Sequence, residues 1–353
     1  MNSKDYYIFF REKLLKWNET DNNRQMPWKG ELDPYKVWLS EIILQQTRVK
    51  QGMNYYKKFI KYFPDVHLLA KASDEKVYKL WEGLGYYNRC KNLLTSARFI
   101  SKDLNGEFPN TFKSILQLPG VGDYTASAIS SFAFNLPCAV VDGNVHRVLS
   151  RFFGIEKGFI SSKEKIYYKQ LAQKLLDTKN PGLYNQAIMD FGATLCTPKK
   201  PNCTDCCLKE KCVAFNNNLQ IALPIKKNKT QNKNLYFNYF VFYFKNKVAI
   251  RQRVDKNIWD KLFDFYLVES ENNFSKKKVQ DFLIQNFSDI NYAKIEISKQ
   301  CIQKLTHRTV FAIFIRVNLE HKIQLSKEFK WVHMNDMALF SFPKIIRDYL
   351  NLY

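Results

Sequence analysis

Four cysteines lie in a short segment that is otherwise rich in Pro, Lys and Asn: Cys196, Cys203, Cys206 and Cys212, with the spacing C-x6-C-x2-C-x5-C. Thiolates so close along the chain can converge on one metal centre at a small entropic cost of loop closure. Four cysteine ligands suit either tetrahedral zinc or a cubane iron–sulfur cluster. Zinc sites usually present two C-x2-C pairs, and this segment has one, so the spacing favours the cluster. A pair of disulfides is the remaining alternative, and disulfides are rare in the cytosol.

A turn with two glycines lies between two segments of helical periodicity, in the run Leu116-Gln-Leu-Pro-Gly-Val-Gly-Asp-Tyr124. The turn would expose backbone N–H groups at the start of the second helix, where the helix dipole also favours an anion. The pattern therefore predicts a helix-hairpin-helix that binds a DNA phosphate through Gly120, Val121 and Gly122. Gly120 and Gly122 would let the phosphate approach the backbone closely.

Two carboxyl groups are candidates for acid–base chemistry. Glu41 shares a predicted helix face with Trp38 and Leu44, and an apolar environment raises the pKa of a carboxyl group. The alternative is that Glu41 lies at the helix edge and pairs with a Lys or Arg. Asp142 precedes a helical run, where it could act only as an N-cap, and the N–H groups there favour its ionised form. A protonated Glu beside an ionised Asp is the pair that glycosidic bond cleavage requires.

The elements that must position these residues fall into two parts. With 353 residues and 46% apolar content, the chain is long enough for two domains. Apolar periodicity predicts an all-α first domain over residues 1–215, with one helical run over 34–51. Residues 216–234 are polar and lysine-rich and are predicted to form a linker. Residues 235–353 are predicted to form an α+β domain, with strands at 236–244, 248–251, 263–267, 293–297 and 309–317 and a helix at 276–286.

The formal net charge of +22 predicts a polyanionic partner, and nucleic acid is favoured over a membrane because no basic amphipathic anchor is found. A lysine-rich solvated surface is the alternative explanation of this charge. The N-terminal residues lack the apolar region of a signal peptide, and no apolar run approaches the ~20 residues that span a bilayer. The sequence therefore predicts a cytoplasmic protein that binds DNA.

These motifs together are similar to those of the endonuclease III superfamily of DNA glycosylases, and within it to the MutY family of adenine DNA glycosylases. The resemblance runs through the whole first domain and is carried by Leu118–Gly122, Val141–Val145 and the cysteine spacing. Further matching segments are Arg24–Trp28, Asp33–Val49 and Gly83–Arg89. The second domain resembles the MutT-like (Nudix-like) C-terminal domain of that family through Gln252-Arg253, Asn257–Phe265 and Leu305-Thr306-His307. It has no G-x5-E-x7-R-E box, so it should not hydrolyse nucleotides.

The resemblance implies an enzyme that removes adenine mispaired with 8-oxoguanine or guanine in double-stranded DNA, acts as a monomer and carries a [4Fe-4S] cluster. It implies that Glu41 protonates the adenine and that Asp142 stabilises the sugar, with Tyr124 and Asn144 beside them. Tyr124 occupies the position of the lysine in the lyases of the superfamily, so no imine would form. Substrate contacts are implied for Arg24, Trp28, Leu44, Gln45, Gln46, Tyr86, Gln186, Thr306 and His307.

One departure from the family's pattern and two rival functions bear on this interpretation. The family's Phe-Ser-His turn is Leu305-Thr306-His307 here, and a Thr hydroxyl can still meet the lesion. A pyrimidine-lesion glycosylase with lyase activity is one rival, against which Tyr124 and the second domain argue. A catalytically silent iron–sulfur protein that binds mismatched DNA is the other, against which the presence of both Glu41 and Asp142 argues.

Overall fold

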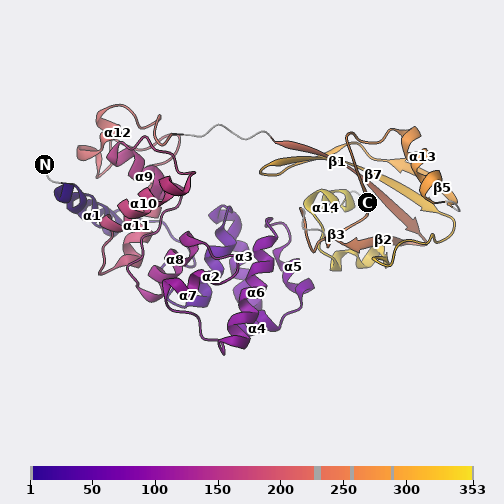
Figure 1. Ribbon diagram of the computed structural model, residues 1–353, viewed down its shortest axis with the longest axis horizontal. Helices are drawn as coiled ribbons and strands as arrows, with labels where there is room; N and C mark the ends of the chain where they lie inside the picture. The colour runs from indigo at the N-terminus through magenta and orange to yellow at the C-terminus, as the bar shows by residue number, and fades with distance from the viewer. Residues whose placement is uncertain (1–2, 226–231, 255–257, 288–289, 352–353) are drawn as a thin grey trace. The chain divides into compact units, whose positions relative to one another are not determined.

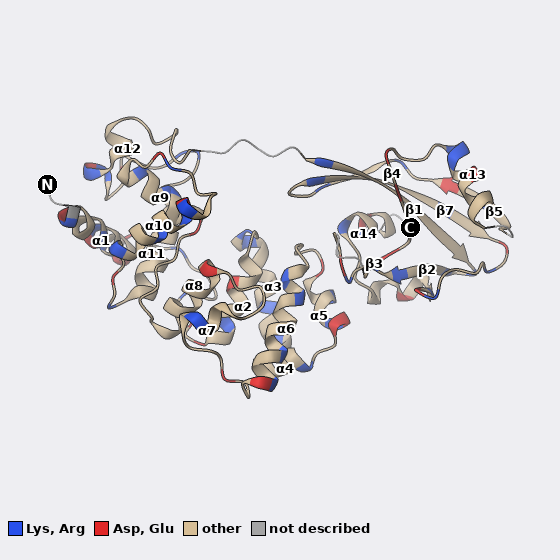
Figure 2. Ribbon diagram, in the orientation of Figure 1, with Lys and Arg blue, Asp and Glu red and all other residues tan. Residues whose placement is uncertain are grey.

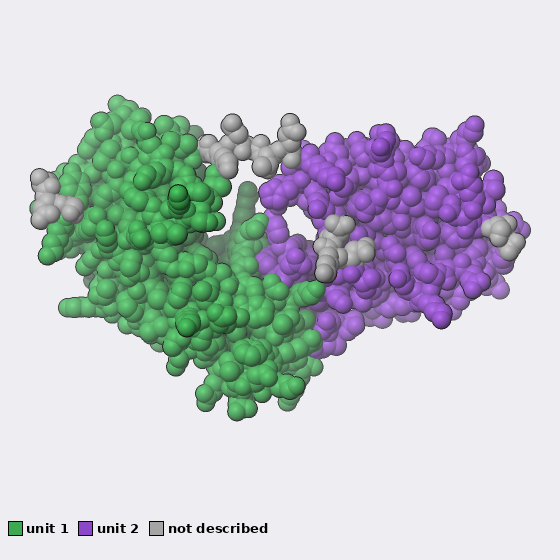
Figure 3. All heavy atoms as spheres, in the orientation of Figure 1, with its two compact units in different colours: residues 1–71, 91–228 green, residues 72–90, 229–353 purple. Residues whose placement is uncertain are grey.

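The computed structural model describes residues 3–225, 232–254, 258–287 and 290–351. The chain forms two compact units (Figures 1 and 3): unit 1 comprises Met1–Lys71 and Lys91–Asn228, and unit 2 comprises Ala72–Cys90 and Lys229–Tyr353. The domain limits expected from the sequence, 1–215 and 235–353, stay a prediction. Part of the predicted linker, residues 226–231, and the start of the Asn257–Phe265 motif lie outside the described residues.

Unit 1 is helical, as the apolar periodicity predicts. Its elements are α1 (Ser3–Thr20), α2 (Pro34–Leu44), α3 (Val49–Tyr62), α4 (Val66–Lys71), most of α6 (Asn88–Asp103), α7 (Phe112–Leu116), α8 (Asp123–Phe134), α9 (Gly143–Phe153), α10 (Ser162–Leu175), α11 (Pro181–Thr194), the 3-10 helix η1 (Lys209–Lys211) and α12 (Val213–Asn216).

The helical run predicted over residues 34–51 is wrong in one place, because the structure divides it into α2 and α3. The backbone N–H of Gln45 donates to the carbonyl of Glu41, and Gln46 has a φ of 55°. A left-handed residue cannot continue a right-handed helix, so the chain turns between the two helices. The turn places Gln45 and Gln46 in a loop at the end of the helix that carries Glu41.

The core of unit 1 that bears on the site lies among α1, α9, α10 and α11. Phe10, Phe152, Tyr168 and Phe191 are each at most 2% exposed, and the rings of Phe10 and Phe152 meet edge to face at 4.8 Å. Cys196, Cys206 and Cys212 pack against the same cluster. Because protein interiors are close-packed, this core fixes the start of α9 relative to α11 and to the cysteine segment.

Unit 2 combines a sheet with helices. Its elements are α5 (Asp74–Trp81), β1 (Lys233–Phe244), β2 (Lys247–Gln252), β3 (Phe263–Asp264), β4 (Tyr266–Ser270), α13 (Lys276–Asn286), β5 (Tyr292–Ile297), β6 (Cys301–Lys304), β7 (Arg308–Leu319), β8 (Phe329–His333), the 3-10 helix η2 (Met334–Leu339) and α14 (Lys344–Leu350). The predicted α+β character is confirmed, and the strands predicted at 236–244, 248–251, 293–297 and 309–317 correspond to β1, β2, β5 and β7. The strand predicted at 263–267 is wrong in one place, because the structure divides it into β3, which pairs with β2, and β4, which pairs with β1. The strands β6 and β8 and the helix α14 were not predicted.

The sheet of unit 2 has apolar side chains on both faces. Its main path runs β3-β2-β1-β7-β5, with β1 and β7 parallel and β6 paired antiparallel with β7. On β1, Phe237 and Tyr239 belong to the core that α14 covers, whereas Phe240 and Phe242 belong to the core that α13 covers. Successive side chains of a strand point to opposite faces, so a strand covered on both sides is apolar at nearly every position.

Figure 2 shows Lys and Arg on helices and strands of both units, in line with the high net charge. In the part of the chain that the structure describes, no helix has the length and apolar character needed to cross a membrane.

Candidate active site

Glu41 is a buried acid on α2. It is 6% exposed and forms a side-chain hydrogen bond with Tyr124 of α8. Burial raises the pKa of Glu41 to about 7; the Tyr124 hydrogen bond acts in the opposite direction, and the charge of Asp142 raises the pKa further. Of the two interpretations of Glu41 left open by the sequence, the buried carboxyl with a raised pKa is therefore confirmed. Such a group can donate a proton near neutral pH.

Asp142 is the N-cap of α9. Its Oδ1 atom accepts hydrogen bonds from the backbone N–H of Asn144 (2.8 Å) and of Val145 (2.7 Å), and its Oδ2 atom accepts one from the Asn144 amide (2.7 Å). Burial raises the pKa of Asp142, while these hydrogen bonds act to lower it. The sequence predicted that the N–H groups of the helix N-terminus favour the ionised form. They do act in that direction, but the cost of desolvation outweighs them.

Arg147 connects this cap to neighbouring segments and was not singled out from the sequence. Its guanidinium donates to the Asn144 side-chain oxygen (2.9 Å), to the Gly192 carbonyl (2.6 Å) and to the Cys196 carbonyl (2.8 Å). Asn144 is thereby held between Asp142 and Arg147. A buried cation needs such partners, and only the folded chain brings them together.

The Pro-Gly-Val-Gly turn joins α7 to α8, as the helix-hairpin-helix pattern predicts. Gly120 has a φ of 79°, and a Cβ atom there would lie 2.7 Å from the Cβ of Asn92. A Cβ on Gly122 would meet nothing within 4 Å, which leaves space in front of the α8 N-terminus. The N–H of Val121 donates to the Leu118 carbonyl and belongs to the turn itself. Phosphate binding at this hairpin stays a prediction.

Gln45 contacts the same hairpin. Its amide nitrogen donates to the Thr125 hydroxyl (3.2 Å) and to the Gly120 carbonyl (3.4 Å). The loop that follows the Glu41 helix is therefore tied to the predicted phosphate-binding turn. Gln46 is exposed, and Leu44 is partly buried, where its Cδ2 atom lies close to Gly52.

Arg24 and Gln186 meet at a buried carboxylate that the sequence did not single out, Asp190 of α11. The Arg24 guanidinium lies 2.7 Å from Asp190 Oδ1, and the Gln186 amide nitrogen lies 2.8 Å from the same atom. Trp28 is 9% exposed and packs edge to face on Tyr56 at 5.3 Å. A buried acid within an apolar helical run is the sequence signal that would have identified Asp190.

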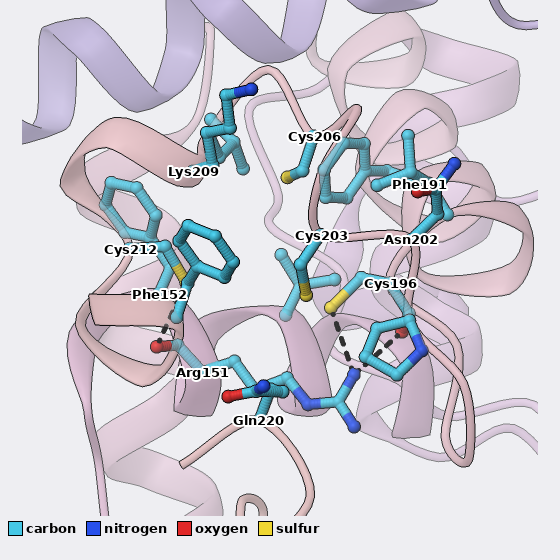
Figure 4. Close-up of a pocket in the computed structure, with 15 residues that line it drawn as sticks. Arg151, Phe152, Phe191, Cys196, Asn202, Cys203, Cys206, Lys209, Cys212 and Gln220 are labelled. Atoms are coloured by element: carbon cyan, nitrogen blue, oxygen red, sulfur yellow. Dashed lines mark hydrogen bonds between the residues drawn. The ribbon is translucent and has the colours of Figure 1, made fainter. Parts of the chain in front are cut away.

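The four cysteines of the C-x6-C-x2-C-x5-C segment line a single cavity, whose other walls include Phe152, Phe191 and Leu208 (Figure 4). All eight cysteines of the chain lie within the described residues and are free thiols, so the disulfide alternative is wrong. Within the described ranges, no group of three or more His, Cys, Asp or Glu side chains is arranged around one metal ion.

Arg151 also lines this cavity and is 2% exposed. Its guanidinium donates to the Cys196 sulfur (3.3 Å), to the Thr197 carbonyl (2.8 Å) and to the Leu223 carbonyl (3.0 Å). The buried Arg151 thus contacts both Cys196, the first cysteine of the segment, and Leu223, which follows the last cysteine.

Two predicted substrate contacts meet within unit 2. The hydroxyl groups of Tyr86 and Thr306 are hydrogen-bonded to one another. Thr306 and His307 are exposed in the turn between β6 and β7, whereas Leu305 is partly buried against the core. The turn is closed by the N–H of Leu305, which donates to the Arg308 carbonyl (2.8 Å). The turn predicted at Thr306 and His307 is confirmed, and its role in reading the lesion stays a prediction.

Comparison with known proteins agrees with this geometry. Residues 39–189 match the HhH-GPD superfamily base excision DNA repair protein family. Over 95% of its length, the chain is 34% identical to an adenine DNA glycosylase of Buchnera aphidicola subsp. Baizongia pistaciae, of which it covers 94%. Over 98% of its length, it is 33% identical to the adenine DNA glycosylase of the subspecies Schizaphis graminum, of which it covers 98%. The chain belongs to the adenine DNA glycosylase family.

A solved structure supports the helical fold of this family in unit 1. A thermostable thymine-DNA glycosylase is 31% identical, with a TM-score of 0.56, over 60% of this chain and 98% of that one. The family match from residue 39 to residue 189 includes Glu41, Tyr124 and Asp142. The matched region therefore contains the buried acid, its hydrogen-bond partner and the capping carboxylate.

Burial of Glu41 predicts a pH-dependent effect on stability. Because its pKa is about 7 in the folded chain and ordinarily 4.5, the folded state holds this proton more tightly, and stability falls as the pH rises between these values. Glu41→Gln removes this titration. We expect the variant to gain roughly 2–4 kcal/mol of unfolding free energy over the wild type at pH 8.5, and much less at pH 4.5.

Urea unfolding at both pH values measures this difference. Glu12→Gln, which changes an exposed carboxyl on α1, is the matched control and should show no such pH-dependent gain. An equal change for Glu41→Gln at pH 4.5 and pH 8.5 would contradict the raised pKa.

Proposed function

We propose that this chain hydrolyses the N-glycosidic bond of adenine mispaired with 8-oxoguanine or guanine in double-stranded DNA. The observation that carries the proposal is the pair of neighbouring carboxyl groups: the buried Glu41, with a pKa of about 7, and the partly buried Asp142, whose charge acts on it. Family membership supports the same reaction, since the relatives are named adenine DNA glycosylases. The net charge of +22 suits a polyanionic substrate.

Glu41 acts as the general acid in this proposal. A base leaves a sugar more readily when a ring nitrogen is protonated, and a carboxylic acid with a pKa near 7 is protonated in a useful fraction at neutral pH. The hydrogen bond with Tyr124 holds the carboxyl group in one orientation. The adenine must be rotated out of the duplex before the acid can reach it.

Asp142 stabilises the positive charge that develops on the sugar. Its carboxylate is fixed by two backbone N–H groups and by Asn144, so it does not need to reorganise when the charge forms. Tyr124 carries a phenol, which cannot form an imine with the sugar. The proposed enzyme therefore releases the base by hydrolysis and leaves an abasic strand uncut.

These roles predict the outcome of one assay. The wild type should release adenine from a duplex with an adenine–8-oxoguanine pair, and strand scission should require alkali. Glu41→Gln keeps the size of the side chain but cannot donate the proton, so single-turnover excision should fall at least ~10²-fold while duplex binding survives.

Asp142→Asn should likewise be slow and still bind, because the sugar cation loses its counter-charge. Near-normal excision by Glu41→Gln would remove this residue from the mechanism. Efficient borohydride trapping of a protein–DNA imine by the wild type would instead favour a lyase.

We further propose that unit 2 reads 8-oxoguanine through the turn between β6 and β7. Thr306 offers a hydroxyl and His307 an imidazole, both exposed, and 8-oxoguanine differs from guanine by its N7–H and O8 groups. A site built for such hydrogen bonds rejects the analogue that lacks them. Because unit 2 resembles MutT but lacks the G-x5-E-x7-R-E box for nucleotide hydrolysis, we assign it a binding role.

A double variant at this turn tests the reading of the lesion. Thr306→Ala with His307→Ala should narrow the preference for 8-oxoguanine over guanine by roughly 1–3 kcal/mol, with adenine excision retained. Lys304→Ala with Ile302→Ala, two exposed residues on β6, is the matched control. If the Thr306 and His307 variant keeps the full preference in binding and in single-turnover rate, this turn is not the reader.

We also propose that Cys196, Cys203, Cys206 and Cys212 hold a [4Fe-4S] cluster. The four thiols line one cavity with aromatic and aliphatic walls, and thiolates are the ligands that such clusters require. Arg151 donates a hydrogen bond to the Cys196 sulfur, which is the kind of outer contact that orients a metal ligand. In this proposal the cluster joins the four cysteines and so holds together the segment that follows α11.

Spectroscopy tests the cluster directly. The purified protein should be brown, with a broad absorbance near ~400 nm from thiolate-bound iron and sulfide, and metal analysis should give about four iron atoms per chain. Cys203→Ala should lose this absorbance, whereas Cys301→Ala, which changes a cysteine of unit 2, should retain it. One zinc and no iron in the wild type would overturn the assignment.

A further inference from the structure

Four side chains contact the two carboxylate oxygens of Asp190 through hydrogen bonds or ion pairs. The side chain is fully buried. Its Oδ1 atom faces Arg24 (2.7 Å) and Gln186 (2.8 Å), and its Oδ2 atom faces Asn22 (3.0 Å) and Lys29 (3.0 Å). A carboxylate has about four lone-pair positions, so this one is saturated with donors.

The donors around Asp190 are themselves connected. The backbone N–H of Arg24 donates to the Asn22 side-chain oxygen (3.2 Å), and the Lys29 ammonium donates to the Arg24 carbonyl (2.9 Å). A fully satisfied polar network in a buried site is rigid, because rotation of one member leaves another without a partner. Asp190 is therefore held in a single orientation.

This arrangement determines which way the Gln186 amide faces. An amide has a nitrogen that donates and an oxygen that accepts, and the two are hard to distinguish by shape alone. An ionised carboxylate only accepts, so Gln186 must present its nitrogen to Asp190. Its Oε1 atom then lies on the other side of the amide, where it accepts no hydrogen bond from the part of the chain that the structure describes. Gln186 itself is partly exposed.

The same helix contacts the catalytic cap. Gly192, two residues beyond Asp190 on α11, lies against Asn144, because a Cβ atom on it would be 2.8 Å from the Asn144 Cβ. Arg147 donates to the Gly192 carbonyl at 2.6 Å. The helix that carries Gln186 and Asp190 is thus packed directly on the turn that holds Asp142.

We infer that Asp190 is a positioning residue that sets base selectivity by fixing the Gln186 carbonyl as a hydrogen-bond acceptor. An acceptor recognises the 6-amino group of adenine and repels the 6-oxo group of hypoxanthine, the same ring with oxygen in place of the amine. Purine has only hydrogen at position 6, so its excision rate should lie between those of adenine and hypoxanthine. This inference rests on the proposed excision of adenine and on Gln186 contacting that base.

Single-turnover excision of the three bases tests the inference. Adenine, purine and hypoxanthine are placed in otherwise identical duplexes opposite 8-oxoguanine, and the ratio of the adenine rate to the hypoxanthine rate is measured. Gln186→Leu removes the acceptor and should lower this ratio about tenfold, the worth of one hydrogen bond. Asp190→Ala removes the carboxylate that orients the Gln186 amide. The amide can then rotate and present its nitrogen to the base, so the ratio should fall by a similar factor.

Three further variants distinguish a change in the orientation of the Gln186 amide from a general loss of structure at the site. Asp190→Glu keeps an acceptor-only group and should restore most of the ratio. Asn22→Ala removes another donor to Asp190 without touching Gln186, and should leave the ratio within about twofold of the wild type. In the Gln186→Leu background, Asp190→Ala should lower the ratio no further, because the amide that it orients is absent.

The outcomes are distinguishable. If the wild type excises adenine and Gln186→Leu keeps the full ratio, the inference is overturned while the proposed function stands, and this holds even if Asp190→Ala does not fold. A further loss of the ratio in the double variant would assign Asp190 a role that does not pass through Gln186, and would also overturn it. No excision of adenine by the wild type would overturn the proposed function itself.

Discussion

The N-terminus of α9 is the part of unit 1 on which the site depends. Asp142 caps the helix, Asn144 binds the capping carboxylate, and Arg147 binds Asn144, Gly192 and Cys196. Buried polar groups are stable only when all of them are paired, so this turn, α11 and the start of the cysteine segment cannot shift independently. A single network thus fixes Asp142, which is proposed to stabilise the sugar, and the segment proposed to hold the cluster.

Three carboxyl groups of unit 1, of which Glu41 and Asp190 are buried and Asp142 is partly buried, have different surroundings and therefore suit the different roles proposed for them. Burial raises the pKa of Glu41 to about 7, although the hydrogen bond with Tyr124 acts to lower it. Burial raises the pKa of Asp142, whereas its three N–H donors and the charge of Arg147 act to lower it. Asp190 lies between Arg24 and Lys29. The same chemical group can therefore supply a proton, face a cationic sugar or orient a neighbouring amide.

In unit 2 the sheet forms the core, and the exposed residues with a proposed role lie in turns. Its sheet is covered on both faces, so the residues that remain available for recognition lie at its turns. Leu305 packs on the core while the next two residues, Thr306 and His307, are exposed. The partly buried Leu anchors the turn, and the hydrogen bond between Tyr86 and Thr306 orients its tip.

Local patterns in the sequence were sufficient for much of the fold. The helices follow from an apolar period of 3.6, and the strands follow from runs of aromatic and β-branched residues. The cap of α9 follows from Asp142 and the turn of the hairpin from Gly120, whose effects act within a few residues. The cysteine spacing likewise indicated one shared site. The break at Gln46 was missed because the segment from 45 to 48 contains no Gly or Pro to mark it.

The tertiary structure decided the properties that depend on residues distant in the chain. Whether Glu41 is buried or paired with a cation could not be read from α2, because Tyr124 and Asp142 lie about 80 and 100 positions away. Asp190 gathers partners from residues 22 to 29. Periodicity tells which face of a helix is buried, but not which polar groups are buried with it. Those partners are set by the packing of whole helices, and they determine the pKa of each acid and the orientation of each amide.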